Sequence, residues 1–242
     1  SVRAIIVAAG KGSRLWPVTQ RMPKTLLPYG DGTILSRIMA NFTAIGVSRF
    51  TIVIGFKGDM IRGYLESRRN FGFDLSIIEN PEYERGNGVS VLKARSAILG
   101  NEGAFLGMSD HLVHPDGLNA LREVTGNALL TDARITEVFD IDDATKVRTA
   151  EERIVEIGKE LSTYNAVDCG VFRIDGRFMD ALEQQIAAGK ESISHGVQSL
   201  IATTGFTSVP MPRHATWIDI DTPAAYEAAL GLADRFRDAG RR

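Results

Sequence analysis

The chain begins with a run of apolar residues that stops at a glycine-rich loop, and this junction constrains the fold more than any other feature. Residues 4–9 read Ala-Ile-Ile-Val-Ala-Ala, and Gly10 follows directly. A continuous apolar run that is cut off by glycine is typical of a strand buried on both faces. Such strands belong to sheets covered by helices on both sides, and ligands bind at the strands' carboxyl ends. The junction therefore predicts an α/β fold with a binding site at residues 10–24.

The rest of the first half repeats this alternation of buried strands and helical stretches. We expect strands at residues 50–54, 75–79 and 104–108, and helices at residues 34–45, 60–69 and 88–99. This order is typical of βαβ units in a parallel sheet. The second half is more mixed, with strands expected at 128–131, 146–148, 154–157, 167–174 and 216–221, and helices at 178–188, 194–203 and from Thr222 onward. The chain is thus expected to form a three-layer, Rossmann-like α/β fold with a mixed, mostly parallel central sheet.

Charge and cysteine content restrict the partners and the compartment. The chain has 28 basic and 30 acidic residues and a formal net charge of −2. It has no basic excess of the kind that binds nucleic acid or anionic membranes, so we expect neither partner. Cys169 is the only cysteine, and residues 4–9 are too short for a signal peptide or a membrane span. We therefore expect a cytoplasmic protein, with Cys169 buried as a small hydrophobic residue.

The loop at residues 10–24 has the composition of a polyphosphate site. Gly10 and Gly12 allow backbone N–H groups to approach an anion closely. Arg14 and Lys24 add positive charge. A surface loop with ordinary glycines and prolines is the alternative interpretation, but the combination of residues favours phosphate binding.

Two better-known phosphate motifs do not fit this loop. A dinucleotide-binding fingerprint needs a third glycine where Leu15 stands. A Walker A loop needs Ser or Thr directly after its lysine, whereas Gly12 follows Lys11. The spacing therefore excludes both of these motifs.

Two aspartates at strand ends are candidates for a metal site. Asp110 stands just after the strand at 104–108, and Asp219 lies on the late strand at 216–221. Alternation puts Trp217, Asp219 and Asp221 on one face of that strand. Carboxylates suit Mg²⁺, which phosphoryl transfer usually requires. Either aspartate alone could equally cap a helix or a turn, but together with the loop they predict a Mg²⁺ site.

The loop resembles the signature of the nucleoside-triphosphate transferases that make nucleotide sugars and related activated alcohols. That signature runs Gly-x-Gly-x-Arg-x-x-Pro-x-Thr-x-x-x-Pro-Lys, and every fixed place is filled here by Gly10, Gly12, Arg14, Pro17, Thr19, Pro23 and Lys24. The resemblance implies the nucleotidyltransferase fold, with Arg14 and Lys24 as catalytic residues that bind the triphosphate. It also supports Asp110 and Asp219 as metal ligands, although Asp221 stands where the family often has glycine. The nucleotide site implied by the family comprises Ala8, Ala9, Gly10, Gly12, Ser13, Asn80, Gly86 and Asn87.

Later blocks resemble one branch of this superfamily, the cytidylyltransferases that convert inositol 1-phosphate and CTP to CDP-inositol. The blocks include residues 86–90, 108–111, 144–148, 157–161, 167–170 and 217–222. This resemblance implies that Lys146 and Lys159 hold the acceptor phosphate and that Asp168 accepts a hydrogen bond from an acceptor hydroxyl. Because the chain has no internal repeat, low-complexity tract or linker, we expect one domain over residues 1–242, with a nucleotide-binding half up to about residue 115 and an acceptor-binding half after it. The branch is often fused to a membrane phosphotransferase, so we expect either a stand-alone enzyme or a domain separated from such a fusion.

The sequence thus predicts a Mg²⁺-dependent cytidylyltransferase that transfers CMP from CTP to inositol 1-phosphate. An oxygen of the acceptor phosphate would attack the α-phosphorus in line and release pyrophosphate. Two alternatives stay open. The same chemistry could serve a hexose 1-phosphate with UTP or dTTP, or phosphocholine or 2-aminoethylphosphonate with CTP. A different class would be a non-catalytic nucleotide-sensing module on the same fold.

Overall fold

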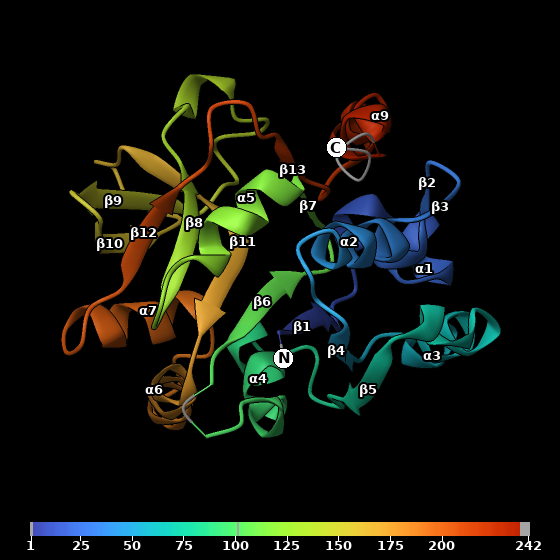
Figure 1. Ribbon diagram of the computed structural model, residues 1–242, viewed down its shortest axis with the longest axis horizontal. Coiled ribbons are helices and arrows are strands. Elements are labelled where there is room, and N and C mark those ends of the chain that lie inside the picture. Colours follow the sequence, from blue (N-terminus) through green and yellow to red (C-terminus); the bar gives the residue numbers. More distant parts are fainter. Residues whose placement is uncertain (1, 101, 238–242) are drawn as a thin grey trace.

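The centre of the computed structural model, which describes residues 2–100 and 102–237, is a nine-stranded sheet (Figure 1). The strand order is β5-β4-β1-β6-β11-β8-β12-β10-β9. The strands are β1 (Arg3–Ala8), β4 (Arg49–Ile54), β5 (Asp74–Glu79), β6 (Ala104–Met108), β8 (Ala128–Asp132), β9 (Lys146–Ala150), β10 (Arg153–Gly158), β11 (Ala166–Ile174) and β12 (Thr207–Pro210). Strands β10 and β11 run opposite to the other seven. The predicted mixed and mostly parallel sheet is therefore confirmed.

Helices cover both faces of this sheet, and strand alternation explains why. In β1, Ile6 and Ala8 join one hydrophobic cluster, whereas Ile5 and Val7 join the other. The first cluster contains side chains of α2 (Ile34–Thr43), α3 (Gly58–Ser67), α5 (Pro115–Arg122), α8 (Pro223–Leu230) and α9 (Ala233–Arg237). The second contains side chains of α4 (Asn87–Lys93), α6 (Gly176–Ala187) and α7 (Ile193–Ile201). The predicted three-layer arrangement follows from these two apolar faces.

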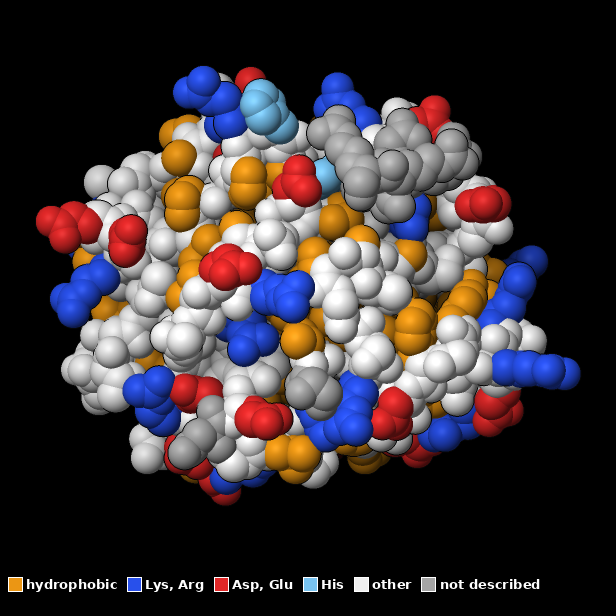
Figure 2. Space-filling view, viewed as in Figure 1, with side chains coloured by type: hydrophobic (Ala, Val, Ile, Leu, Met, Phe, Trp, Pro, Cys, Tyr) orange, Lys and Arg blue, Asp and Glu red, His pale blue; other side chains and the backbone are white. Residues whose placement is uncertain are grey.

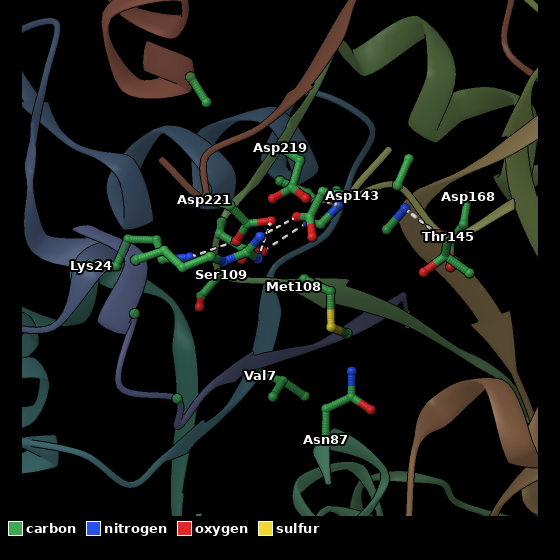
Figure 3. Close-up of a pocket in the computed structure, with 18 of the residues that line it drawn as sticks. Val7, Lys24, Asn87, Met108, Ser109, Asp143, Thr145, Asp168, Asp219 and Asp221 are labelled. Carbon is green, nitrogen blue, oxygen red and sulfur yellow. Dashed lines mark hydrogen bonds and ion pairs between the residues drawn. The ribbon is translucent and has the colours of Figure 1, made fainter. Parts of the chain in front are cut away.

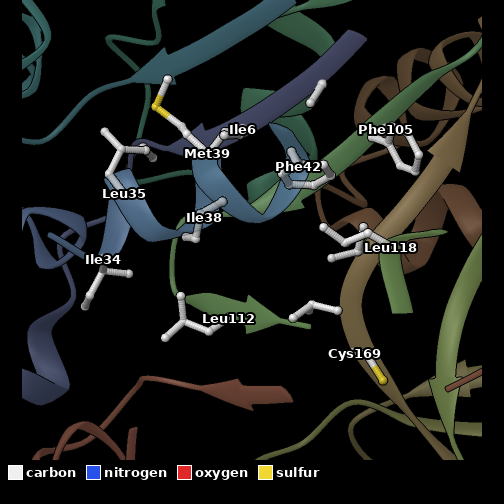
Figure 4. Close-up of a cluster of buried hydrophobic side chains, with 14 of the residues drawn as sticks. Ile6, Ile34, Leu35, Ile38, Met39, Phe42, Phe105, Leu112, Leu118 and Cys169 are labelled. Atoms are coloured by element: carbon white, nitrogen blue, oxygen red, sulfur yellow. The ribbon is translucent and has the colours of Figure 1, made fainter. Parts of the chain in front are cut away.

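Helix α2 illustrates how the first layer is held. Its apolar residues recur at helical spacing, and Leu35, Ile38 and Phe42 face the sheet beside Ile6 and Phe105 (Figure 4). Thr33 caps the helix by accepting a hydrogen bond from the Ser36 amide. Cys169 lies in the same cluster with no exposed surface, as predicted.

A small second sheet lies beside the main one and carries residues of the site. It pairs β7 (His111–Val113) with β13 (Trp217–Asp219) in antiparallel register, with Asp219 opposite His111. Strand β13 is shorter than the predicted strand at 216–221, but the Ile220 amide still bonds to the Asp110 carbonyl, the next place in the same register. This bond ties the end of β13 to the turn after β6.

Several local predictions differ from the structure. The helix expected at 88–99 ends at Lys93, and a 3-10 turn over Arg95–Ala97 follows. Helix α5, strand β12 and helix α9 were not predicted. Helix α9 continues to Arg237, and its Phe236 is buried against Tyr29. Residues 238–242 lie outside the described residues. None of the described helices is both long enough and apolar enough to cross a membrane.

Candidate active site

A cavity of about 330 Å³ opens at the carboxyl ends of β1 and β6 (Figure 3). Side chains from both halves of the chain line it, which places the predicted nucleotide and acceptor residues around one space. The predicted site residues on its wall are Ala8, Gly10, Gly12, Arg14, Lys24, Asn87, Asp110, Lys159, Asp168 and Asp219. Ala9, Ser13, Asn80, Gly86 and Lys146 are not among its lining residues.

The signature loop, residues 10–24, is held in shape by contacts within itself. Gly12 has a φ of 59°, in the left-handed region that favours glycine. A Cβ atom there would lie 3.1 Å from Cε of Lys24, so the glycine also lets the lysine stem pass. The Thr19 hydroxyl donates to the Gly12 carbonyl at 2.7 Å. The fixed Gly, Thr and Lys places of the signature therefore form one packed unit.

Lys24 and Arg14 are both held by carboxylates in this structure. The Lys24 ammonium lies 3.1 Å from Asp110 Oδ2 and 2.9 Å from Asp221 Oδ1. Burial alone would lower the pKa of Lys24, but the two carboxylate charges raise it well above its usual value. Arg14 forms an ion pair with Asp143 and lies 3.1 Å from Asp221 Oδ2. Both cations are thus placed where a charged ligand could exchange with the carboxylates.

His111 lies between two of the aspartates. Its Nδ1 is 2.7 Å from Asp110 Oδ1 and its Nε2 is 3.6 Å from Asp219 Oδ2. Burial would lower the pKa of His111, but the Asp219 and Asp110 charges raise it to about 10. The ring also stacks parallel to Trp217 at 6.2 Å between centroids. His111 therefore packs beside both Asp110 and Asp219.

Asp219 lies partly buried beside the carboxylates of Asp110 and Asp221. Burial, and then the neighbouring Asp110 and Asp221 charges, raise the pKa of Asp219 well above its usual value, although His111 opposes this. Asp219 Oδ1 is buried and has no hydrogen-bond partner among the described residues. Two groups, Asp110–His111–Asp219 and Asp143–Asp219–Asp221, each bring their ligand atoms within 4.8 Å of one another. These residues fit a divalent cation, for which carboxylate oxygens are suitable ligands.

Asp143 belongs to the site but was not predicted from the sequence. It lies in the acidic loop, residues 138–145, which faces the signature loop across the cavity and also contributes Phe139 to the wall. Its carboxylate pairs with Arg14 and lies 3.8 Å from Nζ of Lys159. The one available signal was the Asp-Ile-Asp-Asp run at 140–143, which also suits an ordinary polar turn. The acidic loop therefore enters the site through tertiary contacts.

The three predicted acceptor residues have different positions. Lys159 and Asp168 line the cavity, whereas Lys146 is buried and donates to the Asp142 carbonyl at 2.8 Å. Lys146 therefore anchors the acidic loop and does not face the cavity. Burial raises the pKa of Asp168, although its hydrogen bond from the Gly170 amide, at 2.6 Å, favours the charged form.

The three residues predicted to contact the base, Asn80, Gly86 and Asn87, also lie in different surroundings. Asn80 is fully buried, donates to Ser90 Oγ at 2.8 Å and accepts from the Glu82 amide at 2.9 Å, so it shapes a turn. The Gly86 amide donates to Glu191 Oε2 at 3.2 Å. Asn87 alone of the three predicted residues in this loop lines the cavity.

A glycine on β11 makes room for His111. Gly170 has a φ of 79°, and a Cβ atom there would lie 2.4 Å from the imidazole ring. It sits where the register of β11 against β8 shifts, between Asp168 and Phe172. The irregular part of β11 therefore leaves room for the His111 ring to lie close to the strand.

Comparison with known proteins agrees with this arrangement of loop, carboxylates and sheet. A family profile described as nucleotidyl transferase matches residues 3–232. The chain belongs to the nucleotidyl transferase family. This nucleotidyl transferase is therefore an enzyme of the class that its signature loop predicted, and the predicted fold class is confirmed.

Two curated relatives and two solved structures show how far the likeness extends. The "Bifunctional IPC transferase and DIPP synthase" of Aquifex aeolicus is 30% identical over 227 residues, which are 93% of this chain and 50% of the relative. The protein of the same name from Thermococcus kodakarensis is 33% identical over 233 residues, 96% of this chain and 51% of the relative. The chain thus spans about half the length of these relatives. The structure of the inositol-1-phosphate CTP transferase from T. maritima matches with a TM-score of 0.86 and 26% identity, covering 98% of this chain and 96% of that chain. A putative glucose-1-phosphate thymidylyltransferase from Bacillus anthracis, with a TM-score of 0.81, 19% identity and coverage of 96% and 95%, shares the fold.

Proposed function

We propose that this nucleotidyl transferase transfers CMP from CTP to inositol 1-phosphate, giving CDP-inositol and pyrophosphate. The observation that carries the proposal is the position of Lys24, whose ammonium lies between Asp110 and Asp221 at the mouth of the signature loop. The likeness to the inositol-1-phosphate CTP transferase from T. maritima, over nearly the whole of both chains, supports this substrate pair. The residues before about 115 would bind the nucleotide and those after it the acceptor.

In the reaction, an oxygen of the acceptor phosphate attacks the α-phosphorus of CTP, and the bond to the β-phosphate bridging oxygen breaks. Arg14 and Lys24 would leave their carboxylate partners and contact the triphosphate, where they stabilise charge that develops during transfer. The attacking phosphate oxygen is already ionised, so no side chain needs to remove a proton from it. Positioning and charge neutralisation therefore carry the catalysis.

Asp110 and Asp219 would hold Mg²⁺, with Asp221 and His111 beside them. When bound there, Mg²⁺ supplies charge neutralisation between the carboxylates and the phosphate oxygens. The unpartnered Asp219 Oδ1 supports this assignment, because a buried carboxylate oxygen without a donor is costly unless a cation meets it.

Lys159 and Asp168 are the proposed acceptor residues that the cavity contains. Lys159 would hold the acceptor phosphate, and Asp168 would accept a hydrogen bond from an inositol hydroxyl. On the face drawn in Figure 2, basic and acidic side chains are intermingled. We therefore expect the cations inside the cavity, and not a charged surface, to recognise the phosphates. A phosphotransferase that consumes CDP-inositol, separate or fused in a longer protein, would act next.

Pyrophosphate release tests the proposal directly. We would measure it with Mg²⁺ for CTP, UTP, dTTP, ATP and GTP against inositol 1-phosphate, glucose 1-phosphate, phosphocholine and 2-aminoethylphosphonate. We expect release only with CTP and inositol 1-phosphate. Release with another pair would replace the substrates and keep the mechanism, and no release with any pair would favour the nucleotide-sensing module.

A further inference from the structure

The Gly86-Asn87-Gly88 segment is clamped by a segment from the other half of the chain, residues 191–193. The Glu191 carboxylate accepts from the Gly86 amide at 3.2 Å, and the Glu191 carbonyl accepts from the Gly88 amide at 2.9 Å. Cβ atoms at residues 86 and 88 would lie 2.5 and 2.6 Å from that same carbonyl oxygen. Both glycines are therefore required by the approach of Glu191, and neither is on the cavity wall to meet a phosphate.

The clamp fixes which end of the Asn87 amide faces the cavity. The Ile193 backbone N–H donates to Asn87 Oδ1 at 2.8 Å. Because an N–H can only donate, the oxygen must be the atom that faces Ile193, and the NH₂ group is the other end. Figure 3 shows the amide nitrogen directed into the cavity towards Met108. No described residue accepts a hydrogen bond from this nitrogen, so its donors are available to a ligand.

Two further features hold residues 191–193 in place. Ser192 caps helix α7 in a reciprocal arrangement with His195, which fixes the backbone at the start of the helix. Arg85 donates to Glu191 Oε1 from Nη2 at 2.9 Å and from Nε at 3.1 Å, so the same carboxylate joins residue 85 to the clamp. The donor at Asn87 is therefore oriented by Ile193, which is held in place by residues that do not line the cavity: Arg85, Glu191, Ser192 and His195.

We propose that Glu191 is a positioning residue for nucleotide selection: with Ile193 it presents Asn87 as a fixed hydrogen-bond donor to a base edge that offers an acceptor at N3. Cytosine has an unprotonated N3, whereas uracil carries N3–H and would face donor against donor. A fixed amide cannot turn to accommodate uracil, because turning would leave the Ile193 N–H opposite an NH₂ group. This inference rests on the proposed use of CTP and adds the residues that would enforce it.

Nucleotide binding, measured by titration calorimetry with Mg²⁺ and no acceptor, tests the inference independently of turnover. Asn87→Asp keeps an oxygen for Ile193 but replaces the donor by an acceptor. We expect it to lower the CTP-over-UTP affinity ratio by about tenfold or more, as a mismatched hydrogen-bonding group does. A ratio unchanged in Asn87→Asp would overturn the inference, as would a wild-type protein that binds UTP as well as CTP.

Variants at residue 191 separate positioning from simple structural support. We expect Glu191→Ala to lower the CTP-over-UTP ratio by roughly threefold to tenfold through a looser amide, and Glu191→Gln, which still accepts from the Gly86 amide, to restore most of it. Glu183→Ala is the matched control. Glu183 lies on α6, away from the cavity, where it is exposed and pairs with Arg95, so this variant should leave the CTP-over-UTP ratio unchanged. Equal losses for CTP and UTP in Glu191→Ala would reduce Glu191 to a structural role. Selective CTP binding without pyrophosphate release from inositol 1-phosphate would instead remove the proposed acceptor and leave this inference standing.

Discussion

The signature loop and the acidic loop meet across the cavity, but they are held in different ways. The signature loop is fixed by its own residues, with Gly12 in the left-handed region and Thr19 bonded to its carbonyl. The acidic loop has one local contact, from Lys146 to the Asp142 carbonyl four residues away, but its Asp143 is held in the site by Arg14 and Lys159 from other segments. Residues that a loop places by local geometry leave a pattern in the sequence, whereas residues placed by distant contacts do not. We expect the signature loop to contribute more to catalysis than the acidic loop, because it contains Arg14 and Lys24.

The largest effect is expected from Lys24→Ala. Loss of an ammonium that stabilises developing phosphate charge should lower turnover by about a hundredfold to a thousandfold. Steady-state pyrophosphate release measures this, and circular dichroism with thermal unfolding checks that the variant stays folded. Near-normal turnover would remove Lys24 from the mechanism and overturn the ranking of the two loops.

Gly12→Ala and Gly10→Ala form a matched pair within the signature loop. At residue 12 the new Cβ would meet the Lys24 stem at 3.1 Å in a left-handed backbone, which costs about 1–2 kcal/mol of unfolding free energy. At residue 10 no atom lies within 4 Å of the new Cβ. Since misplacement of Lys24 should cost about tenfold to a hundredfold in turnover, Gly12→Ala should be far worse than Gly10→Ala. Equal activities would show that the loop tolerates a different shape.

Asp143→Asn tests how much the acidic loop contributes to catalysis. It weakens the contact with Arg14 and the attraction to Lys159, so we expect kcat/KM to fall by about tenfold, mainly through the KM of the acceptor. Kinetics with each substrate varied in turn would show it. A loss as large as that of Lys24→Ala would make the two loops equal partners.

The smallest expected effect is on stability and its pH dependence. Burial would raise the pKa of Asp143, but the hydrogen bond and charge of Arg14 lower it below its usual 3.8. A carboxyl group whose folded pKa is depressed stabilises the protein above its unfolded pKa, and this contribution disappears as pH falls through the folded pKa. The pair is partly exposed, so the contribution should stay below about 1 kcal/mol. Denaturant unfolding of wild type and Asp143→Asn should differ slightly at pH 7 and converge below pH 3.8; a gap that persists in acid would contradict the assignment.

Much of the fold could be predicted because buried strands leave continuous apolar runs. Strand β6 was predicted with its observed bounds, and the alternation that places Trp217, Asp219 and Asp221 on one face is confirmed, since all three line the cavity while Ile218 is buried. Helix α5 was not predicted because its start, His114 as the N-cap followed by Pro115, resembles a turn in the sequence.

The candidate site was predictable where one segment contains both the side chain and the reason for its position. Lys24 meets that condition, because Gly12 and Thr19 of the same loop shape its path. Asp143 does not, since its contacts with Arg14 and Lys159 come from other segments. Lys146 has a local partner, the Asp142 carbonyl four residues earlier, but the residue pattern does not show whether its ammonium turns there or to the cavity. The sequence pattern also does not reveal that the Asn80 amide donates to Ser90 in this structure. The catalytic and binding roles of these residues remain predictions.

The contact between Gly170 and His111 has a consequence for protein engineering. Asp168, two residues earlier on β11, is the natural position to alter if a different acceptor is wanted. Any redesign of that strand must keep residue 170 without a side chain, because a Cβ there would push the imidazole that touches both Asp110 and Asp219. If Asp168 contacts the acceptor and Asp110 and Asp219 hold the cation, as proposed, a change of acceptor at β11 also affects the cation site, and a library that randomises β11 should hold Gly170 constant.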